Sequence, residues 1–311
     1  MAFCQTTNHI FAMRFFQSFT FFLTALLSCH HNSPQQQPSQ DFVPQAIFSD
    51  RISQGIVQNN DITEASGLVA SRNYVGGLWT HNDSGGESAV FLVGAKGENI
   101  AKFTLEGVAN IDWEEIDICP FQSIPYIYVA DIGDNSKTRS HCTIYRFAEP
   151  KITGTTHATG TIKQIDKIRF QYNDGSRDAE TVMIDPSTQD IYVVSKREEK
   201  NRLYIIKYPY SLTDINIAQY VTSFPFILST AGDISPSGNE VLIKNYANIF
   251  YWKRQNNESL VETLKRNPTA LPYTLEPQGE AIAWKLDETG YYTLSEKQDD
   301  KPVNLYFYRR N

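Results

Sequence analysis

The segment Asp112-Trp-Glu-Glu-Ile116, followed by Tyr128-Val-Ala-Asp131, is the pattern that decides the fold. An acidic or small residue opens an apolar run, a turn follows, and a second apolar run ends on charged or amide side chains. The pattern occurs five times, and successive copies are 48, 66, 52 and 48 residues apart. The other copies open with Glu64-Ala-Ser-Gly-Leu68, Asp178-Ala-Glu-Thr-Val182, Thr230-Ala-Gly-Asp-Ile234 and Gln278-Gly-Glu-Ala-Ile282.

This repeat predicts an all-β fold, a single β-propeller in residues 46–311. Units of about 50 residues built from short strands are typical of propeller blades. We expect five blades; six is the alternative if the 66-residue interval hides a degenerate blade. The fifth unit lacks a fourth strand, and residues 47–57 have no blade of their own. We therefore expect this N-terminal strand to pair with the last one, which would close the ring and remove an open sheet edge.

The N-terminus has the features of an export signal in residues 1–28. Arg14 precedes an apolar run, residues 15–27, that is shorter than the roughly 20 residues needed to span a bilayer. Leu26-Leu-Ser-Cys29 resembles a bacterial lipobox, in which Cys29 is lipidated; an ordinary secretory signal is the alternative. Residues 29–45 are rich in Gln, Pro and Ser, which predicts a flexible tether. We expect a protein of the bacterial cell envelope that contacts a membrane only through its lipid.

The charge and the cysteines narrow the class of partner and the redox state. The formal net charge is −7, which argues against a nucleic-acid partner and favours cations or neutral polar ligands. Only Cys119 and Cys142 fall within the predicted domain. A disulfide is permitted outside the cytoplasm, but the two cysteines are predicted at opposite ends of non-neighbouring strands. We expect two buried free thiols, with the disulfide as the alternative.

The repeat segments also resemble a known family. Together with Leu78-Trp-Thr-His-Asn-Asp-Ser-Gly85 and Tyr128-Val-Ala-Asp-Ile-Gly-Asp-Asn135, they closely resemble bacterial secreted propellers of the SdiA-regulated type, over most of residues 60–300. That resemblance implies the fold and export, and no particular reaction. More distantly the blades resemble gluconolactonase-type and phytase-type propellers, which implies calcium and hydrolysis. The full ligand sets of those enzymes have no counterpart in the spacing of this sequence.

Polar residues of the repeat are predicted to gather at one mouth of the central channel. In an antiparallel blade the first strand begins on the face where the second strand ends. The first strands contribute Glu64, Asp112, Glu114, Asp178, Glu180 and Glu280. The ends of the second strands contribute Asn245, Lys297 and the residues that we predict to bind a ligand, which are His81, Asn82, Asp83, Asp131, Asp134, Asn135, Lys196, Arg197, Lys244 and Glu296.

Three readings of these residues remain open from the sequence. Glu114, Glu180 and Glu280 occupy one repeat position and are candidate metal ligands, because calcium takes six to eight oxygen ligands. Glu180 could instead act as a catalytic base, with His81 as a proton shuttle beside Asp83. Alternatively, the carboxylates accept backbone amides of the next blade, and His81 is a hydrogen-bonded structural residue. Trp79 and Trp113 could stack a sugar or wedge between blades.

Two functional hypotheses follow. The first is a non-catalytic envelope module that binds a small polar ligand or an envelope protein at the mouth. The second is a calcium-dependent hydrolase of lactones, esters or phosphoesters that uses Glu114, Glu180, Glu280 and His81. The sequence contains no Gly-x-Ser-x-Gly, His-Glu-x-x-His or Cys-x-x-Cys motif, no phosphate-binding glycine loop and no twelve-residue calcium loop. The familiar hydrolase and nucleotide-binding classes are therefore unsupported.

Overall fold

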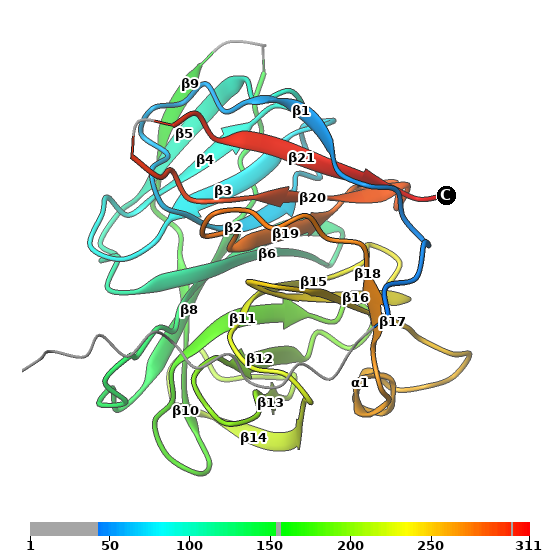
Figure 1. Cartoon of the computed structure of the whole chain (residues 1–311). Coiled ribbons are helices and arrows are strands. Elements are labelled where there is room, and N and C mark those ends of the chain that lie inside the picture. Colours follow the sequence, from blue (N-terminus) through cyan, green and yellow to red (C-terminus); the bar gives the residue numbers. More distant parts are fainter. Residues whose placement is uncertain (1–42, 154–156, 300) are drawn as a thin grey trace, which may run out of the picture. The chain divides into compact units, whose positions relative to one another are not determined.

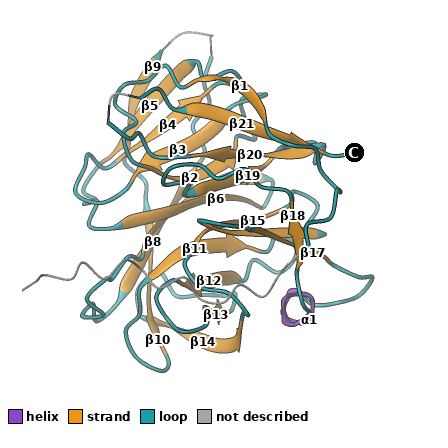
Figure 2. Ribbon diagram, viewed as in Figure 1, coloured by secondary structure: helices purple, strands orange, loops and turns teal. Residues whose placement is uncertain are grey.

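The computed structural model describes residues 43–153, 157–299 and 301–311, and these residues form an all-β unit. Strand makes up 47% and helix 2% of the structure, so the predicted all-β class is confirmed (Figures 1 and 2). Within the described ranges, no helix has the length and apolarity that crossing a bilayer requires. The predicted signal, Cys29 and most of the predicted tether lie outside these ranges.

Most strands fall into five successive groups of antiparallel neighbours. The first group is β2 (Ala65–Ala70), β3 (Leu78–Asn82), β4 (Ala89–Val93) and β5 (Asn99–Leu105); the second is β6 (Trp113–Phe121), β7 (Ile124–Asp131), β8 (Cys142–Ala148) and β10 (Asp166–Tyr172); the third is β11 (Ala179–Ile184), β12 (Ile191–Ser195), β13 (Arg202–Ile206) and β14 (Asn216–Ser223). The fourth is β15 (Ser229–Ile234), β16 (Glu240–Asn245), β17 (Ile249–Lys253) and β18 (Thr269–Leu271); the fifth is β19 (Ala281–Trp284), β20 (Gly290–Leu294), β21 (Asn304–Arg309) and β1 (Ile52–Ile56).

Two of the sheets extend beyond one group. β10 pairs parallel with β14, which joins the second and third groups into one eight-stranded sheet. The edge strands of this sheet, β6 and β11, pack on each other, so the sheet is nearly closed and barrel-like. The remaining strand, β9 (Ala158–Ile162), pairs parallel with β5 of the first group. The strands of the long interval between the second and third repeats are β9 and β10, and both belong to sheets formed by the first and second groups.

The first strands of the five groups follow one another in a circle. β2 packs on β6, β6 on β11, β11 on β15, β15 on β19, and β19 returns to β2. The apolar core is divided in the same way, since each of five buried clusters lies between two neighbouring groups. Trp79 and Trp113 share the cluster between the first and second groups, and both are fully buried. They act as wedges, and neither presents a ring on which a sugar could stack.

The two ends of the described unit meet in one sheet. β1 pairs antiparallel with β21, with Ile52 opposite Phe307, as the sequence predicts. Before β1, Phe48 is buried and forms an isolated bridge with Arg310. Its ring centroid lies 4.9 Å from that of Tyr291. The fifth group is therefore completed by a strand from the other end of the chain.

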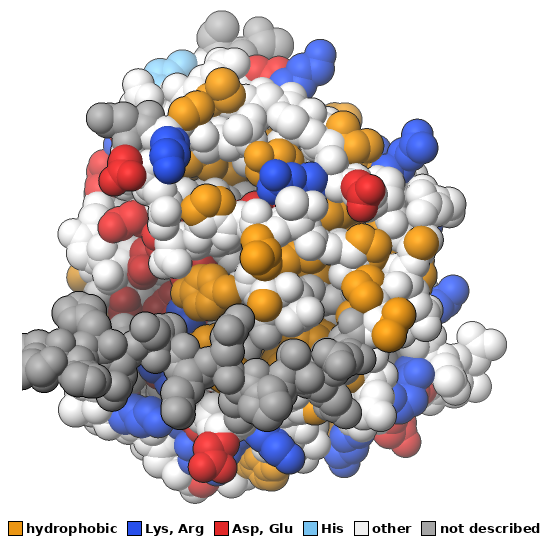
Figure 3. Space-filling model, in the orientation of Figure 1, with side chains coloured by type: hydrophobic (Ala, Val, Ile, Leu, Met, Phe, Trp, Pro, Cys, Tyr) orange, Lys and Arg blue, Asp and Glu red, His pale blue; other side chains and the backbone are white. Residues whose placement is uncertain are grey.

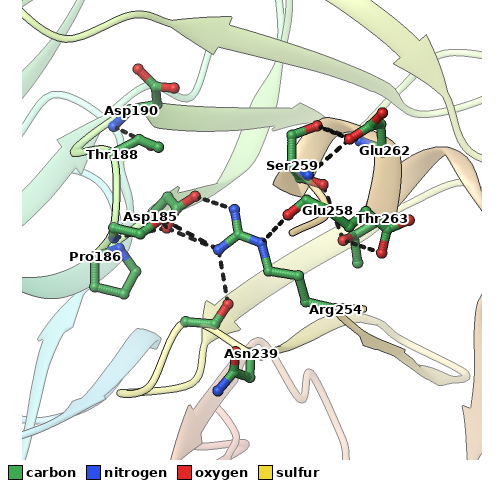
Figure 4. A network of polar contacts seen from close by, with 12 residues as sticks. Asp185, Pro186, Thr188, Asp190, Asn239, Arg254, Glu258, Ser259, Glu262 and Thr263 are labelled. Atoms are coloured by element: carbon green, nitrogen blue, oxygen red, sulfur yellow. Dashed lines mark hydrogen bonds and ion pairs between the residues drawn. The ribbon is translucent and has the colours of Figure 1, made fainter. Parts of the chain in front are cut away.

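A polar network ties the third group to the fourth, as Figure 4 shows. Arg254 follows β17, and its Nη2 donates to Asp185 Oδ2 at 2.7 Å in the turn after β11. Its Nε donates to the carbonyl of Glu258 at 2.9 Å, beside the start of α1 (Leu260–Lys265). Ser259 and Glu262 form a capping box there, the motif whose spacing is present in the sequence. The charged contact anchors the α1 segment to the sheet of the neighbouring group.

Cys119 and Cys142 are buried free thiols, which confirms the expectation from the sequence. They lie in β6 and β8, two strands separated by β7. Burial raises the pKa of each thiol to about 12. Both therefore remain protonated at neutral pH, the form that neither binds metals nor attacks disulfides.

Candidate functional site

The first strands begin, and the second strands end, at the same end of the described unit, which we call the mouth. Four of the first strands carry a β-bulge there, at the same point of the ladder. A bulge inserts an extra residue and re-aims its side chain. The extra residues are Ser66, Glu114, Glu180 and Thr230, and in the fifth group Glu280 immediately precedes β19. Five polar side chains, one from each group, thus occupy equivalent positions.

The register corrects one detail of the repeat alignment. Aligned on Ile234, the fourth copy places Gly232 at the position of Glu180. In the structure Ser229 pairs with Asn245 and Ala231 with Lys244, so Thr230 is the bulged residue. Gly232 lies deeper in the strand, where its N–H donates to Glu115 Oε2 at 2.9 Å. The apolar pattern alone could not reveal this offset, because a bulge shifts the phase of the side chains that follow it.

Carboxylates at the mouth meet in two groups that share one residue. Oxygens of Asp83, Asp112 and Glu114 lie within 4.8 Å of one another, and so do oxygens of Asp83, Glu280 and Glu296. The structure therefore places Glu114 and Glu280, two of the three predicted metal ligands, in different carboxylate groups. Asp83 and Glu296, predicted only as ligand-binding residues, complete these groups together with Asp112.

Burial makes the charged forms of these carboxylates unfavourable. It raises the pKa of Glu114 well above its usual range, and the charges of Glu180 and Asp83 raise it further. Burial also raises the pKa of Asp83, to about 6, and that of Glu296, to about 8, where Glu280 adds to the effect. Acidic side chains gather along the left edge of the face seen in Figure 3. A bound cation would offset the repulsion at the mouth.

Gly133 gives two of these carboxylates their room. A Cβ at this position would collide with Asp112 Oδ2 and with Glu114 Oε1. Only the backbone of the loop after β7 can lie so close to both side chains. Since calcium is bound by carboxylate and backbone oxygens, the residues present fit such a cation.

Glu180, the third predicted metal ligand, is paired with a buried lysine instead. Its Oε1 forms an ion pair with Lys196 Nζ, which also lies 3.8 Å from Glu280 Oε1. Lys196 Nζ is 3.0 Å from the hydroxyl of Tyr246, which donates to Glu280. Burial lowers the pKa of Lys196, but the negative charges of Glu180 and Glu280 outweigh this effect and raise it. This ammonium therefore already neutralises part of the charge on two of the three repeated glutamates.

Several predicted ligand residues form hydrogen bonds that hold the loops of the mouth. Asp131 accepts from Arg139 Nη1 at 2.7 Å, and Asp134 accepts the N–H of Thr138 at 2.8 Å. Asp178 accepts the N–H of Asp134 at 3.0 Å. Arg197 donates to Asp178, and the side-chain oxygen of Asn82 accepts the N–H groups of Thr63 and Glu64. The side-chain oxygen of Asn245 accepts those of Ala247 and Asn248, while Asn135 is exposed.

His81 and Lys244 lie below the surface of the mouth and have no exposed area. The Nδ1 of His81 is 2.9 Å from the carbonyl of Asn82, and burial lowers the pKa of His81 to about 4. Burial likewise lowers the pKa of Lys244 to about 8, and its Nζ donates to the carbonyls of Asn245 and Gly279. His81 is thus uncharged at neutral pH. Its role as a proton shuttle remains a prediction.

The sequence did not point to three residues of the site. Arg139, Tyr246 and Thr230 contact or flank the predicted residues, and Thr230 Oγ1 is buried without a hydrogen-bond partner. Thr230 stands in the repeat, where the bulge register would have identified it. Arg139 and Tyr246 lie in loops that the repeat does not cover, so no pattern indicated them.

Comparison of the chain with protein-family models gives no match, and comparison with curated proteins gives none either.

Proposed function

We propose that the five groups of strands are the blades of a single β-propeller of the SdiA-regulated type. The circle of first strands and the five apolar clusters between neighbouring groups support this architecture. The pairing of β1 with β21 supports closure by the N-terminal strand. Five blades are favoured over six because β9, in the long interval, pairs with β5 of the first group.

We further propose that this propeller is an exported module of the bacterial cell envelope, lipid-anchored at Cys29, that binds a small polar ligand or an envelope protein at its mouth. A divalent cation, with calcium the best fit, would be part of the binding surface. Asp83 would hold it together with Asp112 and Glu114 or with Glu280 and Glu296, because these carboxylates supply oxygen atoms from three different groups of strands.

One observation carries the proposal. Elsewhere, buried carboxylates accept hydrogen bonds from neighbouring groups, as Asp117 does from the N–H of Ile184 at 2.6 Å. At the mouth, no backbone amide, lysine or arginine of the described residues donates to the carboxylate of Asp112, Glu114 or Glu296. Glu114 is only 3% exposed, so few water molecules can replace the missing donors. Such a carboxylate is unfavourable unless another partner binds it.

Thermal unfolding tests the proposal. The purified full chain is melted in chelator and then with graded calcium. Saturation at about 100 times the dissociation constant adds about 2.7 kcal/mol. At about 2–4 °C per kcal/mol, the melting temperature should rise by roughly 5–10 °C. Asp83→Asn should remove the rise, whereas Asp50→Asn, at an exposed site, should retain it. An unchanged wild-type melting curve would refute cation binding at the mouth.

The anchor has its own test. Cells that express the chain are labelled with palmitate, and wild type is compared with Cys29→Ala. We expect label only in the wild-type chain, because Cys29 is the cysteine of the lipobox-like segment. Equal labelling of both, or of neither, would contradict lipidation at Cys29.

A second candidate is a calcium-dependent hydrolase of lactones, esters or phosphoesters. The cationic side of the mouth favours it, since Arg197 pairs with Asp178 at 2.6 Å while its side chain is 45% exposed. A cation near Asp83 and this guanidinium could together stabilise negative charge on a carbonyl or phosphoryl oxygen. The measurement is turnover of model lactones, esters and phosphoesters with and without chelator. Turnover that persists in chelator would contradict this candidate.

A further inference from the structure

The two carboxylate groups at the mouth lie on either side of one shared residue. Asp83, in the loop after β3, belongs to both. Asp112 and Glu114 come from the start of β6, and Glu280 and Glu296 flank β19 and β20 of the fifth group. The first group of strands therefore places Asp83 between ligands from its two neighbours in the circle.

One cation cannot use all five carboxylates. Oxygens within 4.8 Å of one another can converge on a cation at the usual calcium–oxygen distance of about 2.3–2.6 Å. Asp112 and Glu114 meet this condition with Asp83, but not with Glu280 and Glu296. Asp83 has two carboxylate oxygens, and although Oδ1 accepts the N–H of Ser84, each oxygen has a lone pair left with which Asp83 can face both carboxylate groups. In sites with two metal ions, the ions lie about 3.5–4 Å apart.

The charge at the mouth also favours two cations over one. In the part of the chain that the structure describes, no lysine, arginine or histidine forms an ion pair with Asp83, Asp112, Glu114 or Glu296. Glu280 shares Lys196 at 3.8 Å with Glu180. Once cation binding has released their protons, the five carboxylates could balance two divalent cations, whereas a single one would leave at least two negative charges uncompensated.

Buried oxygen atoms without partners are the independent sign of a ligand. Glu180 Oε2 and Thr230 Oγ1 are buried and have no hydrogen-bond partner. Glu180 is 4% exposed and Thr230 is 0% exposed. Each is the bulged residue of its first strand, in the third and fourth groups, as Glu114 is in the second. Leaving such atoms unpaired costs about 1–3 kcal/mol each. Glu180 Oε2 is close to both carboxylate groups, since the other oxygen of Glu180 shares Lys196 with Glu280 and the charge of Glu180 raises the pKa of Glu114.

From this arrangement we infer that the mouth holds two divalent cations bridged by Asp83, one with Asp112 and Glu114, the other with Glu280 and Glu296. The inference rests on the proposed function, because it requires that the mouth bind cations. It assigns the two cations to ligands from different groups of strands, so each can be removed separately.

Equilibrium dialysis of the purified full chain against radioactive calcium measures the stoichiometry. We expect two calcium ions per wild-type chain. Asp112→Asn should retain only the cation beside Glu280, and Glu296→Gln only the one beside Glu114. Asp83→Asn should weaken both by at least tenfold, since it ligates both. The exposed-site variants Asp50→Asn and Glu106→Gln should bind two ions, as wild type does.

The outcomes separate this inference from the proposed function. One ion per wild-type chain would overturn the two-cation site and leave cation binding intact. No calcium bound would overturn both. Two ions retained in both Asp112→Asn and Glu296→Gln would also overturn the inference, by placing the ions elsewhere. Circular dichroism of each variant in chelator checks folding, and because the two variants lie in different groups of strands, a folding failure in one leaves the other as the test.

Discussion

Glu149 and Glu114 are both buried glutamates of the second group of strands, yet their surroundings are opposite. Glu149, 5% exposed, accepts hydrogen bonds from Trp79 Nε1 at 2.8 Å and Ser71 Oγ at 2.5 Å. It also accepts the N–H groups of Arg72 and Asn73. The carboxylate of Glu114, a residue that is 3% exposed, accepts from no donor of the described residues. Burial alone therefore does not distinguish these two carboxylates; the presence or absence of donors does.

The seams between the other groups follow the pattern of Glu149. Asp233 accepts the N–H of Trp284 at 2.7 Å between the fourth and fifth groups, and Asp117 accepts that of Ile184 at 2.6 Å between the second and third. Each of these hydrogen bonds joins two groups of strands. Among the acidic repeat residues, Asp178 and Asp233 therefore accept backbone N–H groups of a neighbouring group of strands, whereas the carboxylate of Glu114 does not.

The largest expected effect is at Glu149. Glu149→Ala leaves several buried donors unpaired, at about 1–3 kcal/mol each. We expect the free energy of unfolding to fall by at least about 3 kcal/mol, measured by urea denaturation. Glu106→Ala, at a side chain 58% exposed, is the control and should change it by less than about 0.5 kcal/mol. Equal midpoints for the two variants would erase the contrast between seam and mouth.

Arg254 tests a seam from the cationic side. Asp185 is fully buried and would keep only its contacts with Ser187 after Arg254→Ala. We expect a loss of about 2 kcal/mol, the usual range for hydrogen bonds to a charged group. The measurement is urea denaturation, with Lys253→Ala, at the exposed neighbouring position, as the control. A wild-type midpoint for Arg254→Ala would show that this seam does not depend on the pair.

Lys244 sharpens the comparison within the mouth, because it contacts carbonyl oxygens where Lys196 contacts carboxylates. The folded state releases its proton near pH 8, whereas the unfolded chain holds it to about pH 10.5. Between these values the unfolded state binds more protons, so the contribution of Lys244 to stability rises with pH. In chelator, the difference in unfolding free energy, wild type minus Lys244→Met, should increase by about 1 kcal/mol from pH 7 to 9. Parallel pH profiles would contradict the lowered pKa.

The smallest expected effect, with the opposite sign, is at Glu114. In chelator, Glu114→Gln removes one of several crowded charges and breaks no hydrogen bond with a described residue. We expect it to leave the free energy of unfolding unchanged or to raise it by up to about 1 kcal/mol. In calcium it should lose most of the wild-type stabilisation. A loss in chelator as large as that of Glu149→Ala would show that Glu114 belongs to the seams.

Local features of the fold could be predicted from the sequence because they depend on neighbouring residues. The apolar repeat indicated the first and second strands, and Ser259 and Glu262 indicated the start of α1. The pairing of β1 followed from counting strands, since the fifth repeat lacked one. The parallel pairing of β10 with β14 was not foreseen, because nothing local encodes which distant edge a strand will meet.

The site was predictable in composition but not in grouping. The repeat identified Glu114, Glu180 and Glu280 as equivalent, and their equivalence suggested one shared ligand. The side chains around them decide otherwise, since Lys196 reaches Glu180 while Asp83 reaches Glu114. These contacts depend on the paths of the loops after β3 and β12, which differ between repeats and carry no periodic signal.

The pairing of β1 with β21 also constrains when the molecule can finish folding. Ser53 Oγ donates to Asn304 Oδ1 across this pair, 251 residues away in sequence. Contacts between such distant residues form slowly, and this one must wait until nearly the whole chain has been made. Until then, Tyr292 and its neighbours in β20 present an unpaired edge on which another chain could add. We therefore expect nascent or C-terminally truncated chains to aggregate, and a chaperone that covers β-strand edges to be needed during synthesis.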